Sequence, residues 1–340
     1  MPATADPARS REPASMRRAL ATLVLAGAGL ACLPQAGAQT GSAALLGGPI
    51  RIVVGYAPGG ATDRAARLVA DGLKDRLGVP VIVENKTGAG GRLAAQAVKA
   101  TPADQNVLMI GNPAVNVVAP IVFKNVGYDQ YKDFVPVAQV TSYDFAVAVG
   151  PSVPVTDING LVAWLKANPG QANVGVPATG SLPHFFALML GDKAGVKTQV
   201  VGYRGSAPLA TDLLGGTVPV AVDTMDTMIP MHEAGKLKIL AIGGANRSAS
   251  LPKVPTLKES GFDVVADGWN TLFAPASMPS TKVDAIAEAV RALLAEPATR
   301  KRFEDAQMVP VSLSRAQTAA SLDAYRKVWE PVVRASGIEQ

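Results

Sequence analysis

The sequence predicts an α/β protein made of two lobes that are joined by two strands. Strand–turn–helix units alternate along two blocks of the chain, and several of the turns are rich in glycine. No long linker separates the blocks, and a length of 340 residues is enough for two ordinary domains. Such alternation is typical of parallel sheets with right-handed helical crossovers.

The first block begins after residue 49. Short apolar runs predict buried strands, apolar residues at three- and four-residue spacing predict helices, and Pro and Gly predict the turns between them. The spacing of Ala66, Val69, Leu73 and Leu77 predicts a helix that ends at Gly78. These patterns predict strands at 50–54, 81–83 and 107–110, and helices at 66–77 and 92–100.

The second block begins near residue 143 and repeats the alternation. It predicts strands at 145–149, 174–176, 199–201, 218–222 and 237–242, and helices at 158–167, from 184, and at 207–214. A strand at 271–273 and helices within 282–305 and 316–333 follow. We expect the chain to cross between lobes at 141–146 and 266–272. The first lobe is then 49–143 plus 270–340, and the second is 144–269, a geometry suited to hinge closure.

The N-terminus predicts export. Arg17 and Arg18 precede an apolar run over 19–33, and Ala36-Gly37-Ala38 supplies a small-residue cleavage site. We therefore expect a cleavable signal peptide over 1–38 and a periplasmic location, with either Met1 or Met16 as the true start. The one cysteine, Cys32, lies in this segment and leaves a lipoprotein as an alternative. No later apolar run has the 20 or so residues that span a bilayer.

Composition and motifs exclude several function classes. Hydrophobic residues make up 48% and charged residues 17%, which is typical of a globular chain. The basic residues are scattered despite a net charge of +5, so nucleic-acid binding is not expected. With two histidines and no G-x-S-x-G, H-E-x-x-H or P-loop pattern, we predict no catalytic activity, no cofactor and no metal.

Several segments, in this order, resemble the Bug family of tripartite tricarboxylate transporter receptors. The resemblance covers residues 49–338 and rests on segments 52–63, 81–91, 203–223, 235–241, 251–261 and 269–275. It implies a type II periplasmic binding protein fold, with two α/β lobes, two hinge strands and a ligand cleft between the lobes. It also implies a solute-binding protein that delivers a small carboxylate to a membrane permease. The family's ligands are di- and tricarboxylates, acidic amino acids and aromatic acids. We expect a monomer. A role in signalling to a sensor kinase and, less favoured, an exported enzyme that acts on a small acid are the alternatives.

Glycine turns directly before helices predict how an anion is held. The first N–H groups of a helix have no partner in the helix and carry a partial positive charge, and glycine lets a ligand approach the backbone. Such turns occur at 58–63, 87–92 and 179–184. Because ligands of α/β proteins bind at the carboxyl ends of strands, we expect these turns to face one another across the cleft.

The candidate ligand-binding residues follow from these turns and from neighbouring strand ends. In the first lobe they are Tyr56, Ala57, Gly59, Gly60, Thr62, Asp63, Gly88, Ala89, Gly91 and Asn112. In the second lobe they are Thr179, Gly180, Ser181, His184, Tyr203, Gly205 and Asp223.

Some of these assignments have an alternative. Thr62 and Asp63 either contact the ligand or cap their helix. His184 either donates to a carboxylate or lies on an interior helix face. Asp223 either orients backbone amides or binds an ammonium group. Asn112 stands where hydroxyl-rich residues are usual in the family, which leaves the ligand open at that position.

Overall fold

The computed structural model describes residues 43–306 and 308–338, and these belong to one compact unit. The predicted signal peptide over 1–38 lies outside the described residues. Within the described ranges, no helix is both long enough and apolar enough to cross a membrane.

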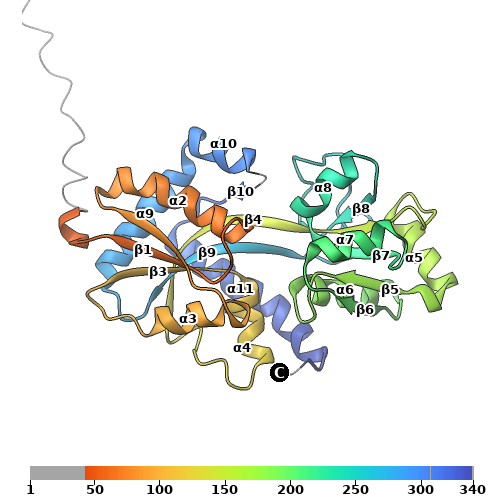
Figure 1. Cartoon of the computed structure of the whole chain (residues 1–340), viewed down its shortest axis with the longest axis horizontal. Coiled ribbons are helices and arrows are strands. Elements are labelled where there is room, and N and C mark those ends of the chain that lie inside the picture. Colours follow the sequence, from red (N-terminus) through yellow and green to blue (C-terminus); the bar gives the residue numbers. More distant parts are fainter. Residues whose placement is uncertain (1–42, 307, 339–340) are drawn as a thin grey trace, which may run out of the picture. The chain divides into compact units, whose positions relative to one another are not determined.

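The first lobe is built on one sheet with helices on both faces (Figure 1). Its strands lie in the order β2-β1-β3-β9-β4, and β10 pairs with β4. The bounds are β1 Ile50–Val54, β2 Val81–Asn85, β3 Asn106–Gly111, β4 Phe134–Val149, β9 Asp267–Pro275 and β10 Val309–Pro310. β2, β1 and β3 are parallel, whereas β9 and β10 are antiparallel to the strands they pair with.

Alternation along β1 explains the two helical layers. Side chains of a strand point to opposite faces in turn, so Ile50, Ile52 and Val54 share one face and Val53 lies on the other. α2 (Ala61–Leu77) and α9 (Ser280–Ala295) cover the first face. α3, α4 and α11, which are Arg92–Lys99, Ala119–Val122 and Arg315–Ala335, cover the second. α10 (Pro297–Asp305) packs on β10 and α2.

The second lobe repeats this arrangement on a second sheet. β6, β5 and β7 are parallel, and β7 and β8 pair antiparallel with the end of β4. The bounds are β5 Asn173–Val176, β6 Gln199–Gly202, β7 Val220–Thr224, β8 Lys238–Ile242, α5 Ile158–Ala167, α6 Leu182–Ala194, α7 Ser206–Leu214 and α8 Met225–Glu233. α5 and α6 pack on one face of the sheet and α7 and α8 on the other.

Two antiparallel strands connect the lobes. β4 pairs with β9 in its first part and with β7 and β8 in its last part, so one strand belongs to both sheets. The β4–β9 pairing ends with Asp144 directly opposite Asp267. Asn270 on β9 donates to the Thr141 hydroxyl on β4 at 2.9 Å and accepts from the Thr62 hydroxyl at 2.9 Å, which ties the start of α2 to both strands.

The fold agrees with the predicted class, and three features differ from the pattern analysis. The parallel arrangement holds only for β2, β1 and β3 and for β6, β5 and β7, because every pairing with β4 or β9 is antiparallel. β4 begins at Phe134, well before the predicted 145, since Pro136 and polar residues interrupt its apolar pattern. α8 was not predicted, and the proline inside it, Pro230, weakens its helical signal.

Candidate ligand cleft

Three loops of the first lobe meet at the carboxyl ends of β2, β1 and β3. A Cβ added at Gly55 would lie 2.7 Å from the Gly91 Cα, so the loops after β1 and β2 touch backbone to backbone. The Tyr56 hydroxyl donates toward the Asn112 Oδ1 at 3.1 Å and lies 3.3 Å from the Gly90 carbonyl oxygen. Burial raises the pKa of Tyr56 to about 12, although the Asn112 contact opposes this. Tyr56 thus joins all three loops.

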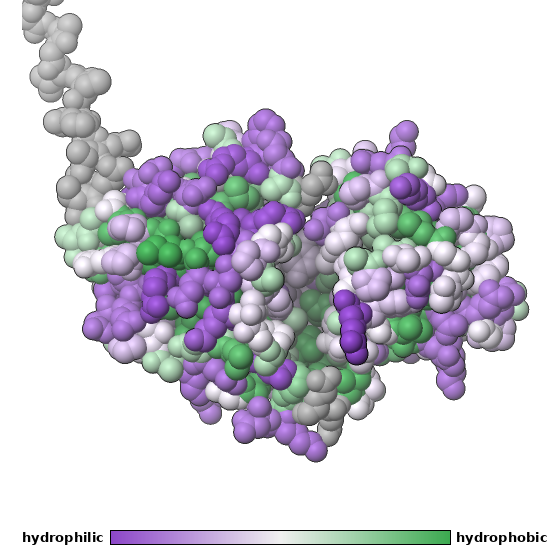
Figure 2. Space-filling model, in the orientation of Figure 1, coloured by the Kyte–Doolittle hydropathy of each residue, from purple (hydrophilic) through white to green (hydrophobic). Residues whose placement is uncertain are grey.

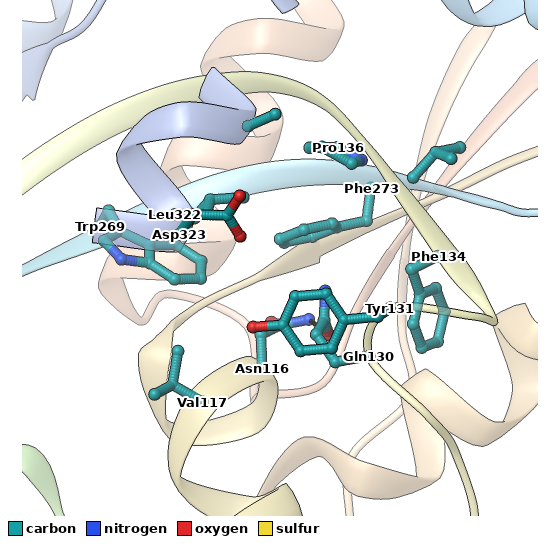
Figure 3. Close-up of a pocket in the computed structure, with 12 residues that line it drawn as sticks. Asn116, Val117, Gln130, Tyr131, Phe134, Pro136, Trp269, Phe273, Leu322 and Asp323 are labelled. Carbon is teal, nitrogen blue, oxygen red and sulfur yellow. Dashed lines mark hydrogen bonds between the residues drawn. The ribbon is translucent and has the colours of Figure 1, made fainter. Parts of the chain in front are cut away.

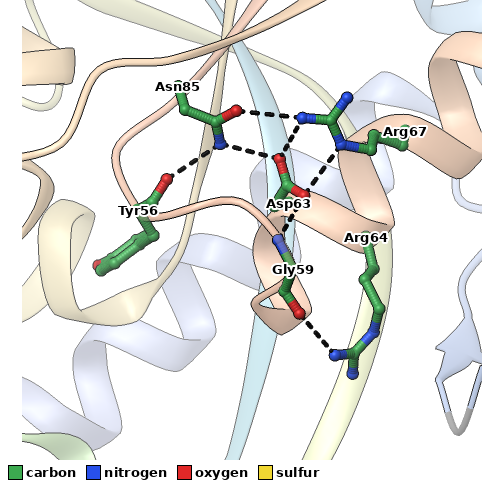
Figure 4. A network of polar contacts seen from close by, with 6 residues as sticks. All are labelled: Tyr56, Gly59, Asp63, Arg64, Arg67 and Asn85. Atoms are coloured by element: carbon green, nitrogen blue, oxygen red, sulfur yellow. Dashed lines mark hydrogen bonds and ion pairs between the residues drawn. The ribbon is translucent and has the colours of Figure 1, made fainter.

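Asp63 holds the glycine turn in place. Its carboxylate accepts from the Gly59 N–H at 2.8 Å, from the Asn85 amide at 2.8 Å and from two nitrogens of Arg67 (Figure 4). Burial alone would raise the pKa of Asp63, but these hydrogen bonds lower it to about 2. The Asn85 amide also donates to the Tyr56 carbonyl at 3.0 Å. The carboxylate is therefore occupied by the protein's own donors.

Arg64 is a cation at the same turn that the sequence patterns did not single out. Its guanidinium donates to the Gly59 carbonyl at 2.9 Å (Figure 4). It also lies 3.8 Å from the Asp226 carboxylate at the start of α8. The contact joins the two lobes, and its long distance and the exposure of Arg64 leave the guanidinium accessible.

Two loops of the second lobe lie side by side at the carboxyl ends of β5 and β6. The Gly205 N–H donates to the Pro177 carbonyl at 2.8 Å, and the Tyr203 N–H to the Val176 carbonyl at 2.8 Å. A Cβ at Gly202 would lie 2.1 Å from the Thr179 hydroxyl oxygen. Gly205 has φ of +113°, which only glycine adopts easily, and it directly precedes α7.

The first turn of α6 presents two polar side chains. The His184 Nδ1 accepts from the Gly180 N–H at 3.1 Å, so a neutral imidazole carries its proton on Nε2 as a donor. Burial lowers the pKa of His184 and favours this neutral form. The Ser181 hydroxyl is buried and has no hydrogen-bond partner within the described part of the chain.

Tyr203 and Asp223 face the interior of the second lobe. The Tyr203 hydroxyl donates to Asp212 on α7 at 2.9 Å, and burial followed by this contact raises the pKa of Tyr203 to about 12. Asp223 is 3% exposed and accepts from the Thr224 N–H at 2.7 Å. Burial raises the pKa of Asp223 to about 6, against a hydrogen bond from Ser206. Asp223 thus holds the starts of α7 and α8, and Tyr203 holds the last part of α7.

Three helices begin at these loops without a side-chain cap. The N-cap residues are Gly60 for α2, Ser181 for α6 and Gly205 for α7, and none of them caps its helix through a side chain. α5 and α11 differ, because Asp157 and Ser314 accept from backbone N–H groups of their first turns. The uncapped helix starts supply N–H groups and partial positive charge in both lobes.

The two connecting strands carry Tyr143, Asp144 and Asp267 between the lobes. The Tyr143 ring lies against Gly268, where a Cβ would come within 2.2 Å of it. Burial, followed by the nearby Tyr56, Asp226 and Asp267, raises the pKa of Tyr143, so its hydroxyl lies near groups of both lobes. Burial raises the pKa of Asp144 and of Asp267 to about 6, and for Asp144 the charge of Asp267 adds to this.

The structure thus groups the predicted residues into two sets. Tyr56, Gly91 and Asn112 come together in the first lobe with the 59–60 turn, and Thr179, Gly180, Ser181 and His184 with Gly205 in the second. Among the predicted residues Ala57, Gly59, Gly60, Ala89 and Thr179 are exposed. The surface is hollowed between the two lobes (Figure 2). Thr62 is bonded to Asn270 instead of being open to the hollow.

Known sequences that are similar to this chain include a family model and several curated relatives. The family model described as "Tripartite tricarboxylate transporter family receptor" matches residues 65–338. A UPF0065 protein of Bordetella bronchiseptica is 34% identical over 94% of this chain and 93% of its own length. Protein BugT of Bordetella pertussis is 30% identical over 85% of this chain and 89% of its own.

Solved structures share the fold. An R. palustris protein solved with adipate is 30% identical, with a TM-score of 0.76 over 86% of this chain and 98% of that one. MatC of Rhodopseudomonas palustris, solved with bound malate, is 28% identical with a TM-score of 0.71 over 84% and 98%. The periplasmic binding protein BugD is 27% identical with a TM-score of 0.69 over 86% and 98%. The two-lobed fold is therefore that of periplasmic binding proteins.

Proposed function

The chain belongs to the tripartite tricarboxylate transporter receptor family, and we propose that it captures a small dicarboxylate between its lobes for delivery to the membrane permease of such a transporter. The observation that carries the proposal is the set of uncapped helix starts at Gly60, Ser181 and Gly205. One belongs to the first lobe and two to the second, so each lobe offers a place for one carboxylate.

In the first lobe, one carboxylate accepts from the backbone N–H groups at the start of α2. The Asp63 network fixes the preceding turn, so the turn does not have to be ordered when the ligand binds. Arg64, exposed and held at this turn by the Gly59 carbonyl, adds a charge-assisted contact. Its weak contact with Asp226 is exchanged for the ligand as the lobes close.

In the second lobe, the other carboxylate accepts from the starts of α6 and α7. The Ser181 hydroxyl gains the partner that it lacks, and the Nε2 of His184 supplies a further donor. Relatives solved with adipate and malate hold ligands that carry two carboxylates, which agrees with one anion position in each lobe. The Tyr56 and Tyr143 rings then line the middle of the ligand.

The proposed role is binding and release, without chemistry on the ligand. His184 is not paired with a nucleophile or a carboxylate that would make it a general base, as far as the described residues go. The family and the solved neighbours are solute-binding receptors. We propose that the mature protein acts in the periplasm after removal of residues 1–38.

Thermal unfolding with a ligand panel tests the proposal. We expect succinate, adipate or malate to stabilise the protein by about 2.7 kcal/mol at 100 times its Kd, with one molecule bound per chain by calorimetry. Monocarboxylates of equal length should bind far more weakly, because one lobe is then left without an anion. A panel in which citrate or benzoate binds and no dicarboxylate does would contradict the assignment of the ligand class.

A matched pair of variants tests the role of the backbone. Gly60 has φ of −71°, and a Cβ there would meet only the Ala57 carbonyl oxygen at 3.6 Å, so Gly60→Ala should fold normally. The added methyl group obstructs the anion position and should weaken dicarboxylate binding at least tenfold. Gly170→Ala on the surface, where a Cβ meets nothing within 4 Å, is the control. Equal dicarboxylate affinity in both variants would contradict the proposal that backbone N–H groups at the start of α2 bind the carboxylate.

A further inference from the structure

A second pocket lies within the first lobe, on the other side of the segment that follows Asn112. It is bounded by β4 and β9, by α11 and by the π-helical turn η2, Ala114–Val118. Its volume is about 240 Å³, which is room for several water molecules or a small organic molecule. None of the residues predicted for the cleft lines it.

Aromatic rings form most of its wall. Trp269, Phe273, Phe134 and Tyr131 surround the space (Figure 3). The first three are at most 3% exposed, and the Trp269 and Phe273 ring centroids are 6.1 Å apart, so these rings are held by packing. Tyr131 is 55% exposed and forms the outer part.

A carboxylate points into the space between these rings. Asp323 on α11 lines the pocket, and Figure 3 shows its carboxylate between Trp269 and Phe273. The nearby basic side chain on α11, Arg326, pairs instead with Glu330 at 2.8 Å. Asp323 has no hydrogen bond or ion pair with any residue in the described ranges.

One of the rings already binds a cation. The Arg326 guanidinium lies 4.5 Å from the Tyr131 ring centroid, although Arg326 does not line the pocket. The negative face of an aromatic ring attracts a cation, and the attraction is stronger when the pair is shielded from water. Several rings and a carboxylate around one space therefore favour a cationic group inside it.

Two residues that line the pocket carry buried polar atoms without hydrogen-bond partners in the described part of the chain. The Trp269 indole N–H and the Asn116 Oδ1 are buried and lack hydrogen-bond partners among the described residues, and both residues line the pocket. Ordered water can accept from the Trp269 N–H, which an ammonium group cannot do because it has only donors, and the Asn116 Oδ1 lies against Gly111. Asp323 is exposed, so water solvates its charge when the pocket is empty; an anion in the pocket would be repelled by this carboxylate, whereas a cation would pair with it.

We propose that this pocket binds a small organic monocation with an apolar body, such as an alkyl- or arylammonium ion. The ammonium group pairs with Asp323, and the apolar body packs against Trp269 and Phe273. The pocket is separate from the carboxylate cleft, so the two sites can be occupied together.

Calorimetry with two isosteric probes tests this assignment in the mature protein. Benzylammonium should bind at least tenfold more tightly than benzyl alcohol, with a change in tryptophan fluorescence from Trp269. Asp323→Asn should remove the difference between the probes, and Tyr131→Leu should weaken benzylammonium several-fold. Both residues are exposed, so both variants should fold.

Asp305→Asn, which changes an exposed aspartate paired with Lys301 on α10, is the control and should bind benzylammonium normally. Dicarboxylate affinity should be equal in all of these variants, which keeps the result independent of the cleft. Equal affinity for the two probes, or benzylammonium binding that survives Asp323→Asn unchanged, would overturn the proposal.

Discussion

Removing one charge between the connecting strands should make the protein more stable. Asp144 and Asp267 are directly opposite on β4 and β9, where Cβ atoms lie about 5 Å apart. Burial, helped by the Asp267 charge, raises the pKa of Asp144 from 3.8 to about 6. At about 1.4 kcal/mol per pKa unit, ionised Asp144 costs about 3 kcal/mol at neutral pH.

Asp144→Asn keeps the shape of the side chain and removes its charge. We expect the melting temperature at pH 7.5 to rise by about 6 °C, because 1 kcal/mol corresponds to about 2 °C or more in a chain of this size. Differential scanning calorimetry on the mature protein measures the shift. Asp104→Asn, at an exposed aspartate in the loop before β3, is the control and should change the melting temperature little.

The pH dependence follows from the direction of the pKa shift. A carboxyl group with a raised folded pKa binds its proton more tightly in the folded state, so the wild type should gain stability as pH falls from 7.5 through 6. Asp144→Asn should show a smaller gain between pH 7.5 and 5, with the remainder due to Asp267 and Asp223, whose pKa values are also raised to about 6. An unchanged or lower melting temperature for the variant at pH 7.5 would refute the reasoning.

Three further changes probe the supports of the cleft. Asp63→Ala should lower the free energy of unfolding in urea by about 2 kcal/mol at pH 7, because the pKa of Asp63 is lowered from 3.8 to about 2. This contribution is present above pH 3.8 and is lost as pH falls toward 2. An equal loss in the variant at pH 2 would therefore contradict the assignment. Ser314→Ala removes the capping box of α11 and should cost about 1 kcal/mol without changing dicarboxylate affinity; a loss of affinity would show that the cap also shapes the cleft. Gly91→Ala should lower the melting temperature, because φ is +92° and the Cβ would lie 2.7 Å from the Val115 side chain; normal stability would count against the tight packing of this loop.

Local patterns in the sequence predicted that the loops after β1, β2 and β3 lie together. Each glycine turn follows an apolar strand, and the carboxyl ends of neighbouring parallel strands meet at one edge of a sheet. Tyr56, Gly91 and Asn112, which are far apart in sequence, are therefore grouped as expected. The bounds of β1, α5 and α7 also lie within one residue of the predicted ranges.

Side-chain directions and distant partners could not be predicted in this way. Thr62 bonds to Asn270, and Asp144 faces Asp267, only because β4 and β9 pair across more than one hundred residues of chain. Tyr203 lies at a strand end like Tyr56, yet its hydroxyl turns inward to Asp212. The Asp63–Arg67 pair was within reach of sequence analysis, since the two residues are one helical turn apart, but Asn85 belongs to another strand.

The position of β9 in the first sheet has a consequence for folding. β9 lies between β3 and β4 and bonds to both, yet it is made only after the whole of the second lobe. Until then β3 and β4 present unpaired, apolar edges of the kind that aggregate. Contacts of such long sequence separation also form slowly. We therefore expect the strands of the second lobe to pair before the sheet of the first lobe is complete. A chain that ends before residue 267 should be unable to complete the first lobe.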